Sequence, residues 1–508
     1  MPSLPVASAN NDRCVDAHQN KEQASTTTTA NCTDTSTPKF LWILGSCALD
    51  RLLAVAHYPE PETKMRTTAY HEVGGGNASN VAHAAALLLS PRPASSTTTT
   101  TTTSAAASRV VRLCTKIGAD AMGQTVLKEL QAARVDTEHD FFHVVPASTT
   151  ALTTVLVDRQ HHTRTCLFTP GTCGEWTVEE MRHIIGTNNN DSDNNKNNIP
   201  WHNVLHFHSD ARHTDAALYV ARQAKAHRVP ISLDVEKDRH SPALDELLVL
   251  ADIIFTNALQ LKDYLKRLTL EWEAKAQPKQ QQERQPPLPP MDVNVHVCNR
   301  TKLSSAEVEA FVGALEPMTY FTRVHQQIGK QIVITKGDQG SIHVQCDDIS
   351  VLEEMDDNSA EFREKDNIPC SVVIEEGCIE NENKNTIFKL RQEFMDYDST
   401  GTKRRRFCAS YTLHAIGILP NVPVVDTTGA GDALLGGYLA GLLHPKGLFP
   451  RVADCLRLGA WVAGHKIQGP GARTTLPTAA QCAAELGTED PAIELRKRIT
   501  AFGNMTSK

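Results

Sequence analysis

Residues 426–443 read DTTGAGDALLGGYLAGLL and directly follow the apolar run VPVV. The apolar run predicts a buried strand, and the small apolar residues after Asp432 predict a helix. Gly429, Ala430 and Gly431 stand where this helix begins, so their main-chain amides can come close to a ligand. Unpaired N–H groups and the positive end of the helix dipole attract anions at such a position. The sequence therefore predicts a cradle for an oxyanion or a phosphate group.

Asp432 stands beside this cradle, although a carboxylate repels phosphate at short range. We interpret it as a general base, which takes the proton from a hydroxyl group that attacks phosphorus. The alternative is that Asp432 stabilises an ordinary helix start and that the glycines form an ordinary turn. An isolated Gly-x-Gly-Asp would favour this alternative. The strand before it and the glycine-rich helix after it favour phosphoryl transfer.

Strand and helix patterns alternate along most of the chain. The strand patterns lie at residues 40–44, 110–118, 204–208, 231–235, 253–257, 331–337 and 422–426. The helix patterns lie at residues 81–89, 121–135, 214–228, 241–251, 259–268 and 454–467. This alternation predicts an α/β fold whose central, mostly parallel sheet is covered by helices on both faces.

Two β-rich runs, 149–158 and 163–168, do not fit the alternation and read as a hairpin around the turn RQHH. We expect a small β lid built from about residues 48–75 and 140–170. In open parallel sheets, ligands bind outside the carboxyl ends of the strands. The residues that directly follow strands should therefore line one crevice: Ser209, Asp210, Glu236, Asn257, Thr335, Gly337 and the run 426–432.

Composition indicates one large domain in this chain of 508 residues, at 39–480. Residues 1–38 are polar and show no apolar periodicity, so we expect a disordered tail there, and a second tail at 481–508. Polar, Pro-rich or acidic runs predict insertions that do not belong to the core. These insertions are expected at about 91–108, 187–200, 273–292 and 347–406.

Charge and cysteine usage exclude several classes of protein. The net charge is −8, the pI is near 6.2, and the basic run KRRR at 403–406 reads as a solvated loop. We therefore expect no nucleic-acid partner. The 13 cysteines form no CxxC pair, which is typical of reduced intracellular thiols. No apolar run reaches the ~20 residues that span a membrane, and no signal-peptide pattern is present. We expect a cytoplasmic protein without a membrane partner.

His206 and His208 lie on one face of a predicted strand and are a candidate metal pair. No further Cys or His cluster completes such a site at a suitable spacing, so we favour packed polar side chains there. The sequence also lacks the GxxxxGK[ST] loop of P-loop ATPases. It lacks GxGxxG after its first strand, which disfavours a nicotinamide-dependent dehydrogenase.

The run DTTGAGD and the helix of small residues after it resemble the carboxyl-side signature of the ribokinase-like (PfkB) sugar kinases. GGGNASNVAHAAALL, residues 74–88, resembles their amino-side signature, and the two occur in the order of the family. Within the family the local pattern is most similar to the ketohexokinases, on GSCALD (45–50), YP (58–59), Glu62, GGNASN (75–80) and VEK (235–237). The resemblance covers about residues 40–477.

This resemblance implies a ribokinase-like fold and a kinase that uses ATP with Mg²⁺ to phosphorylate a hydroxymethyl group of a ketohexose. It implies a lid hinge at Gly75 and Gly76, with Asp432 as the base and Gly429, Ala430 and Gly431 as the anion hole. The implied sugar-binding residues are Asp50, Glu62, Gly76, Asn77, Asn80 and Asp432. The implied nucleotide-binding residues are Asn257, Thr335, Gly337, Gly429 and Gly431. Asp426 and Thr428 match positions that hold a monovalent cation, potassium, in relatives.

The sugar-binding roles also agree with elementary chemistry, because carboxylates and amides bind hydroxyl groups through charge-assisted hydrogen bonds. The alternative for Asn77 and Asn80 is helix capping, and Asp50 can be an ordinary loop acid. Arg164, on the second hairpin strand, can reach phosphates or remain solvated.

The sequence departs from the family pattern at two positions. Gln260 stands where the family has the acid of Asn-x-x-Glu, and Glu62 stands where a shorter Asp is expected. Ribose, a nucleoside or a sugar phosphate is therefore the alternative acceptor. A kinase-shaped binding protein without turnover is a second alternative, disfavoured because Asp432 and its glycines are intact. Relatives suggest a homodimer through the lid sheets.

Overall fold

The structure is a computed structural model, and its described residues all lie in the compact unit Pro38–Lys508. They are residues 38–89, 109–158, 160–161, 163–186, 199–236, 241–257, 264, 294–297, 303–356, 371–379, 386–397 and 403–502. The expected tail at 1–37 and the insertions at 91–108, 187–198 and 273–292 lie outside them, as does the expected helix at 259–268 apart from Tyr264. Among the described residues, no helix is long and apolar enough to cross a lipid bilayer.

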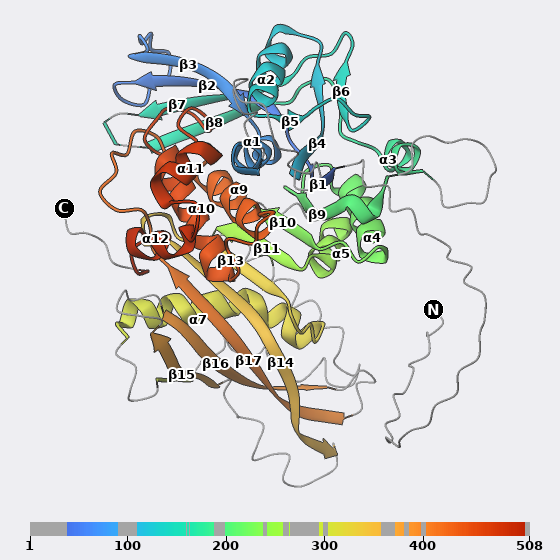
Figure 1. The fold of residues 1–508 in the computed structure, drawn as a ribbon, viewed down its shortest axis with the longest axis vertical. Coiled ribbons are helices and arrows are strands. Elements are labelled where there is room, and N and C mark those ends of the chain that lie inside the picture. The colour runs from blue at the N-terminus through green and yellow to red at the C-terminus, as the bar shows by residue number, and fades with distance from the viewer. Residues whose placement is uncertain are drawn as a thin grey trace, which may run out of the picture. The chain divides into compact units, whose positions relative to one another are not determined.

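A 13-stranded sheet forms the centre of the described part of the chain (Figure 1). Its parallel half runs in the order β13-β11-β10-β9-β1-β4-β5, with β6 also paired to β4. These strands are β1 (Lys39–Leu44), β4 (Arg109–Gly118), β5 (Val135–Asp136), β6 (Phe142–Val145), β9 (Val204–Ser209), β10 (Ile231–Val235), β11 (Ile253–Asn257) and β13 (Gln331–Thr335). The predicted parallel sheet is confirmed.

Helices cover both faces of the sheet, as the alternation along the strands requires. In β1, Phe40, Trp42 and Leu44 enter one buried cluster, whereas Leu41 and Ile43 enter the other. The first cluster lies under α3 (Val178–Ile185), α4 (Thr214–Ala226), α5 (Pro242–Leu250) and α7 (Ser305–Thr319). The second lies under α1 (Asn77–Leu89), α2 (Ala121–Ala132), α9 (Ala430–Leu442), α10 (Val452–Lys466), α11 (Ala479–Leu486) and α12 (Pro491–Arg498).

A second sheet has four strands in the order β3-β2-β7-β8, and we call it the lid sheet. Its strands are β2 (Ala48–Val55), β3 (Ala69–Gly75), β7 (Ala151–Asp158) and β8 (Thr163–Thr169). The hairpin predicted for the last two is confirmed, since they pair antiparallel. Leu52, Val73 and Val155 form a small buried cluster of their own under this sheet. The lid sheet is therefore separate from the central sheet and contributes its own small core.

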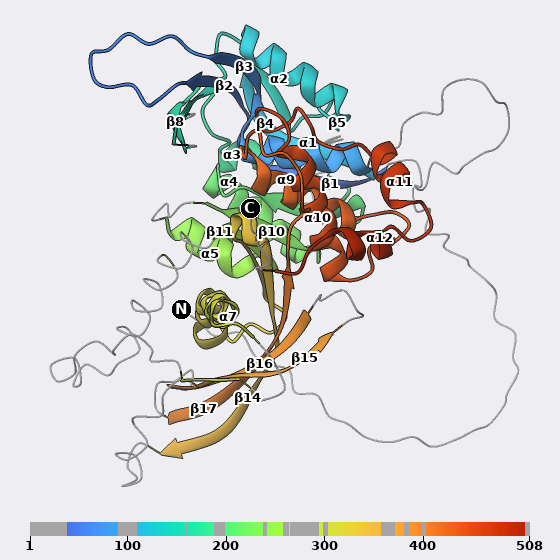
Figure 2. The ribbon, with the colours of Figure 1, turned by 90° about the vertical axis from the view of Figure 1, so that its left-hand side faces the viewer.

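The segment at 347–406 is not the unstructured insertion that its acidic composition predicts. It contains all of β15 and β16, most of β14 and the start of β17, which extend the central sheet in the order β15-β16-β17-β14 (Figures 1 and 2). They are β14 (Ser341–Asp356), β15 (Ser371–Ile379), β16 (Thr386–Tyr397) and β17 (Lys403–Ile416), and β12 (Asn294–Val297) pairs with β15 at the edge. Alternating apolar residues such as Val372, Ile374, Phe388 and Leu390 are buried against the core. The acidic composition of the whole segment hides this alternation of buried and outward residues, which is typical of a strand.

The basic run KRRR lies in β17 and not in a solvated loop. The pairing of β14 with β17 places Glu353 opposite Arg406, Glu354 opposite Arg405 and Asp356 opposite Lys403. The run therefore belongs to a paired strand of the sheet.

Two further expectations are wrong. Residues 422–426 form no strand: Val424 and Val425 are 60% and 59% exposed, and Pro423 has no N–H to donate to a ladder. The expected tail after residue 480 instead holds the end of α11 and all of α12. Leu495 on α12 is fully buried in the second cluster, so this segment belongs to the packed domain.

Candidate active site

Helix α9 begins at the cradle that the sequence predicts. Gly429 caps the helix with φ +72°, and a Cβ there would lie 2.5 Å from the Cβ of Ala472, so the position requires glycine. Beside Gly431, by contrast, no atom lies within 4 Å of where a Cβ would stand. The open space is therefore on the side of Gly431, at the positive end of the helix dipole.

The amides of the cradle are not equivalent. The N–H of Ala430 donates to the carbonyl of Thr427 at 3.2 Å, which closes the turn before the helix. Within the described part of the chain, no hydrogen bond from the amide of Gly431 is found. The amides left available for an anion are therefore those of Gly431 and the residue after it, whereas the amide of Ala430 closes the turn.

Asp432 lies in the first turn of α9, where its Oδ2 accepts a hydrogen bond of 2.8 Å from Nδ2 of Asn80 on α1. Burial and the nearby carboxylate of Glu236 raise the pKa of Asp432 from 3.8 to about 7, against the opposing effect of the Asn80 hydrogen bond. A carboxylate with a pKa near neutrality can both accept and release a proton at physiological pH.

Several more carboxylates surround Asp432. Asp50 and Asp210 also raise its pKa, after Glu236. Burial, with the charges of Glu236, Asp432 and Asp210, raises the pKa of Asp234 well above its ordinary value. The side chain of Asn77 hydrogen-bonds to Asp234 and partly offsets this effect. The site is thus strongly acidic around Asn77 and Asn80.

Asp210 follows β9 and joins the loop after β1 to the start of α1. Its Oδ2 accepts hydrogen bonds from the main-chain N–H and the hydroxyl of Ser46 at 2.9 and 2.5 Å. It also accepts one from the N–H of Ala78 at 3.2 Å. Asp210 therefore fixes the N-terminus of the helix that carries Asn77 and Asn80. The sequence placed it in the crevice, and this anchoring role emerges from the structure.

Asp50 faces the hinge residues under the lid sheet. It lies on β2 opposite Val73 and Thr153, is 6% exposed, and has a pKa raised by burial against a hydrogen bond from Thr153. A Cβ on Gly75 would lie 2.1 Å from Oδ1 of Asp50, and the next residue, Gly76, has φ +87°. The two glycines are therefore required for this carboxylate to reach the site.

Glu62 is not brought to the site. It has φ +62°, is exposed, and lies in the loop that connects β2 to β3, which extends away from the central sheet (Figure 2). In the described part of the chain, no hydrogen bond joins Glu62 to Asp50 or to α1.

The residues predicted to hold the nucleotide come together at the carboxyl ends of β11 and β13. Asn257 pairs with Thr335 in the strand register, and Gly337 follows with φ +58° in a short turn. Gln260, the position of the missing acid, lies outside the described residues. Val424 and Val425 are exposed immediately before the cradle, so an apolar surface adjoins it.

Arg164 connects the lid sheet to the cradle. From β8 its Nη1 donates hydrogen bonds of 3.1 Å to the hydroxyls of Thr427 and Thr428. A guanidinium group over the cradle can stabilise negative charge on a bound phosphate. The structure therefore favours the phosphate side of the two interpretations given for this residue.

Asp426 and Thr428 lie together, but protein donors surround the carboxylate. Oδ1 of Asp426 accepts from the N–H and the hydroxyl of Thr428 at 2.8 and 2.7 Å, and Oδ2 accepts from the N–H of Gly471 at 2.7 Å. Despite burial, these bonds and the positive charge of Lys466 lower the pKa of Asp426. The ammonium of Lys466 donates to the main-chain oxygen of Asp426 at 2.7 Å.

The histidine pair of β9 is a packed polar group, as expected. Nε2 of His206 and Nδ1 of His208 lie 2.8 and 2.9 Å from the hydroxyl of Ser232. Burial lowers the pKa values of the two histidines to about 4 and about 3. Among the described residues, no group of three or more His, Cys, Asp or Glu is placed to hold a metal ion.

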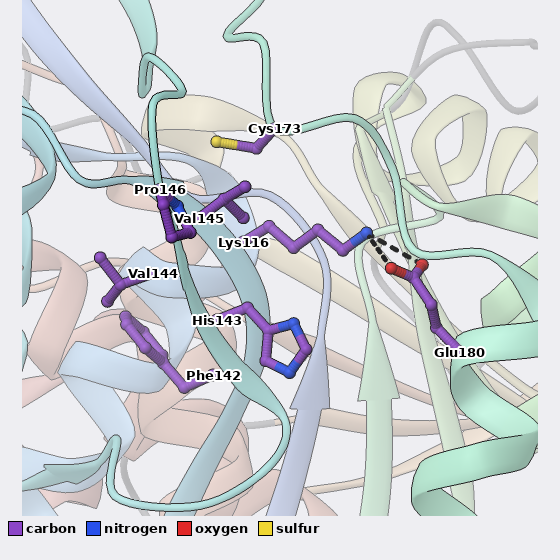
Figure 3. Close-up of a pocket in the computed structure, with 8 residues that line it drawn as sticks. All are labelled: Lys116, Phe142, His143, Val144, Val145, Pro146, Cys173 and Glu180. Carbon is purple, nitrogen blue, oxygen red and sulfur yellow. Dashed lines mark hydrogen bonds and ion pairs between the residues drawn. The ribbon is translucent and has the colours of Figure 1, made fainter.

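A surface hollow of about 460 Å³ is lined by residues of the paired strands β4 and β6 and by Glu180 of α3 (Figure 3). Its only lysine, Lys116, is paired with Glu180 at 2.7 and 2.9 Å and lies over the ring of Trp176. None of the predicted site residues lines this hollow. Lys116 and Glu180 already pair with each other, and no residue of α9 lines the hollow.

The chain is similar to several known proteins. The model of the pfkB family carbohydrate kinases matches residues 39–288 and 404–479. The chain is 43% identical to Adenosine kinase 1 of Arabidopsis thaliana over 53 residues. This stretch is 10% of this chain and 14% of that protein. Over 54 residues the chain is 50% identical to an uncharacterized sugar kinase of Archaeoglobus fulgidus, covering 11% of this chain and 20% of that protein.

The fold is also found in a solved structure. The ribokinase of Giardia lamblia superposes with a TM-score of 0.51 at 14% identity, over 88% of this chain and 97% of that one. Likeness at this identity concerns the fold, which is the ribokinase-like α/β fold expected from the sequence.

Proposed function

The chain belongs to the pfkB family carbohydrate kinases, and on this premise we propose that it transfers the γ-phosphoryl group of ATP to a hydroxymethyl group of a ketohexose such as fructose. One observation carries the proposal. The carboxylate of Asp432, held by Asn80 at 2.8 Å, stands in the first turn of the helix where Gly431 leaves open space beside its amide. An acceptor hydroxyl placed there has a base on one side and an anion hole on the other.

In the proposed reaction Asp432 accepts the proton of the acceptor hydroxymethyl group as its oxygen attacks the γ-phosphorus. The bond from this phosphorus to the bridging oxygen of ADP breaks, and ADP leaves. The amides of Gly431 and Asp432, at the start of α9, stabilise the charge that develops on the phosphoryl oxygens. Arg164, which reaches the cradle from β8, adds a positive charge over the same oxygens.

ATP would lie along the carboxyl ends of β11 and β13. Asn257, Thr335 and Gly337 adjoin each other there, and the exposed Val424 and Val425 offer an apolar surface for the purine base. The positive end of α9 would receive the phosphates. The lid sheet would close over the acceptor and exclude water, which otherwise competes as phosphoryl acceptor.

The residues present fit Mg²⁺ bound together with the nucleotide. Mg²⁺ prefers oxygen ligands and commonly uses one or two carboxylates together with substrate phosphates and waters. Asp234 and Glu236 supply carboxylates within electrostatic range of Asp432, and they would hold the ion. When bound, Mg²⁺ neutralises negative charge on the transferring phosphoryl group.

The surroundings of Asp426 do not fit a monovalent cation. Its carboxylate already accepts three hydrogen bonds from Thr428 and Gly471. The ammonium of Lys466 lies on the main-chain oxygen of the same residue, and its pKa, lowered by burial to about 8, keeps it mostly charged at pH 7. A potassium ion there would be repelled by this charge.

The acceptor side suits a neutral polyhydroxyl compound. Asp50, Asn77 and Asn80 offer carboxyl and amide groups to hydroxyls, and burial with the neighbouring carboxyl groups raises the pKa values of Asp234 and Asp432, so further negative charge is disfavoured there. A sugar phosphate, one of the alternative acceptors, would be repelled there. Ribose and nucleosides remain alternative acceptors.

The resemblance to the family suggests a homodimer through the lid sheets, and we include this assembly in the proposal. Leu167 and Phe168 on the edge strand β8 are 52% and 54% exposed, which supports a partner at this edge. Light scattering of the purified chain at several concentrations tests it.

The experiment that tests the function is a coupled assay of ADP release by the purified chain. The acceptors are fructose, ribose, adenosine and fructose 6-phosphate, each with ATP and Mg²⁺. We expect the highest kcat/KM with fructose and the lowest with the sugar phosphate. Acceptor-dependent ADP release with none of them would refute the proposal, and a preference for ribose or adenosine would replace the ketohexose.

A further inference from the structure

Arg473 lies in the loop between α10 and α11 and is only 5% exposed. Its Nε donates to Oδ1 of Asn80 at 2.9 Å. Its Nη2 donates to the hydroxyl of Ser79 at 2.7 Å and to the carbonyl of Gly75 at 3.1 Å, and its Nη1 lies 3.3 Å from Oε2 of Glu129. A single buried guanidinium therefore contacts α1, α2 and the end of the lid strand β3.

The first consequence concerns the orientation of Asn80. An asparagine amide has one oxygen, which accepts, and one nitrogen, which donates, whereas a guanidinium can only donate. Arg473 therefore fixes the amide oxygen of Asn80 on its own side. The amide nitrogen must then face Asp432, and it donates to the carboxylate at 2.8 Å. The reversed amide would place two donors against each other.

The second consequence concerns the hinge of the lid sheet. Oε2 of Glu129, which pairs with Arg473, also accepts a hydrogen bond of 2.8 Å from the N–H of Gly74. A Cβ on Gly74 would lie 1.9 Å from Nη1 of Arg473, so the guanidinium is in direct contact with the hinge backbone. Movement of β3 about Gly75 must therefore change the contacts of this guanidinium.

We propose that Arg473 is a positioning residue that sets the Asn80 amide against Asp432 and couples this pair to the hinge of the lid sheet. The inference rests on the proposed function and adds a residue that acts through Asn80. Its planar fork of donors serves four acceptors at fixed angles, which the single ammonium of a lysine cannot reproduce.

The test compares Arg473→Lys and Arg473→Met with the parent enzyme. We expect kcat to fall 10- to 100-fold in both variants, because displacement of a catalytic group by about 1 Å can cost 10²-fold. The KM for ATP should change less than twofold. Arg112→Met is the matched control, since Arg112 is paired with Asp136 at 3.0 Å and contacts no site residue. It should leave kcat unchanged.

The pH profile provides a readout that a general loss of packing would not move. Without a donated bond from Asn80, the acidic limb of kcat/KM should move to higher pH. The groups that face Asp432 keep its pKa high: Glu236, Asp50 and Asp210 raise it, and Asn80 opposes them. The ammonium of Lys466 also interacts electrostatically with the Asp432 carboxylate. Lysine at 473 keeps a positive charge, so a shift in Arg473→Lys reports the lost geometry.

A double-mutant cycle shows whether Arg473 acts through Asn80. If it does, Arg473→Lys should lower kcat much less when added to Asn80→Ala than when introduced alone. Independent, multiplicative losses would overturn the proposal, as would parent-like kcat in Arg473→Lys. Hydrogen exchange supplies a readout without turnover, because the amides of residues 74–78 should exchange faster in Arg473→Lys. If the parent itself transfers no phosphoryl group, the proposed function fails, and unchanged exchange would separately refute the coupling to the hinge.

Discussion

Replacement of Asp432 by asparagine separates the catalytic role of this carboxylate from its effect on folding. Asparagine keeps the size of the side chain but cannot take the proton from the attacking hydroxyl group. The kcat should therefore fall by about 10² to 10⁴, the usual contribution of a general base. ATP should still bind, because the proposed nucleotide contacts come from Asn257, Thr335 and the start of α9.

The same substitution should stabilise the fold, and the structure gives the magnitude. Burial and nearby carboxylates raise the pKa of Asp432 from 3.8 to about 7. Between these values the folded state holds a proton that the unfolded state has lost, so the free energy of unfolding of the parent falls as pH rises. At about 1.36 kcal/mol for each pH unit, the total is roughly 4 kcal/mol. This is an upper limit, because Asp432 remains partly solvated.

The assay is urea unfolding of parent and Asp432→Asn at pH 5, 6, 7 and 8. The variant's advantage should grow with pH up to about 7 and then level off. Glu179→Gln, at a side chain that is 88% exposed, serves as the control and should follow the parent. Parallel stability curves for parent and Asp432→Asn, or turnover retained in the variant, would refute the reasoning.

Three further perturbations test other parts of the site and the fold. Gly75→Ala puts a Cβ 2.1 Å from Oδ1 of Asp50. Steady-state kinetics should therefore show the KM for the acceptor raised at least tenfold and the KM for ATP unchanged. The same acceptor KM in parent and variant would contradict this. The rate of the parent should be the same in potassium and in tetramethylammonium salts, whereas Lys466→Met should need potassium. A parent that needs potassium would contradict the inference that the Lys466 ammonium excludes a monovalent cation from Asp426. Asp454→Asn should lower the free energy of unfolding by roughly 3–5 kcal/mol, because Asp454 is fully buried among three arginines, and exposed Glu246→Gln should change it by less than about 1 kcal/mol.

The parallel half of the sheet was predictable because its strands and helices carry strong local patterns. In β1 the apolar residues are consecutive, as expected for a strand buried on both faces. The strand at 386–397 was missed because the charged residues Lys389 and Arg391 alternate with its buried residues and hide the apolar pattern. At Val424 and Val425 a strand was predicted that the structure does not contain. Their apolar run has the pattern of a buried strand, but both side chains are exposed.

The residues of the cradle and of α1 could be located from sequence because each occupies a recognisable turn between two elements. Arg473 and Lys466 could not be located in this way. Each is a single basic residue without a motif, and its meaning comes from contacts with Asn80 and Asp426, which lie far away in the chain. Glu62 had a motif position but no structural support, because a loop of the lid sheet carries it away from Asp50.

The most direct measurement is phosphorus NMR of the purified chain incubated with ATP, Mg²⁺ and fructose, alongside Asp432→Asn. An ester on a hydroxymethyl oxygen couples its phosphorus to the adjacent methylene protons, so the spectrum identifies both transfer and position. The parent should convert ATP to ADP and an equal amount of this ester, and the variant should leave ATP nearly intact. Inorganic phosphate in place of the ester, or the same ester yield from the variant, would contradict a carboxylate that activates an alcohol beside the start of α9.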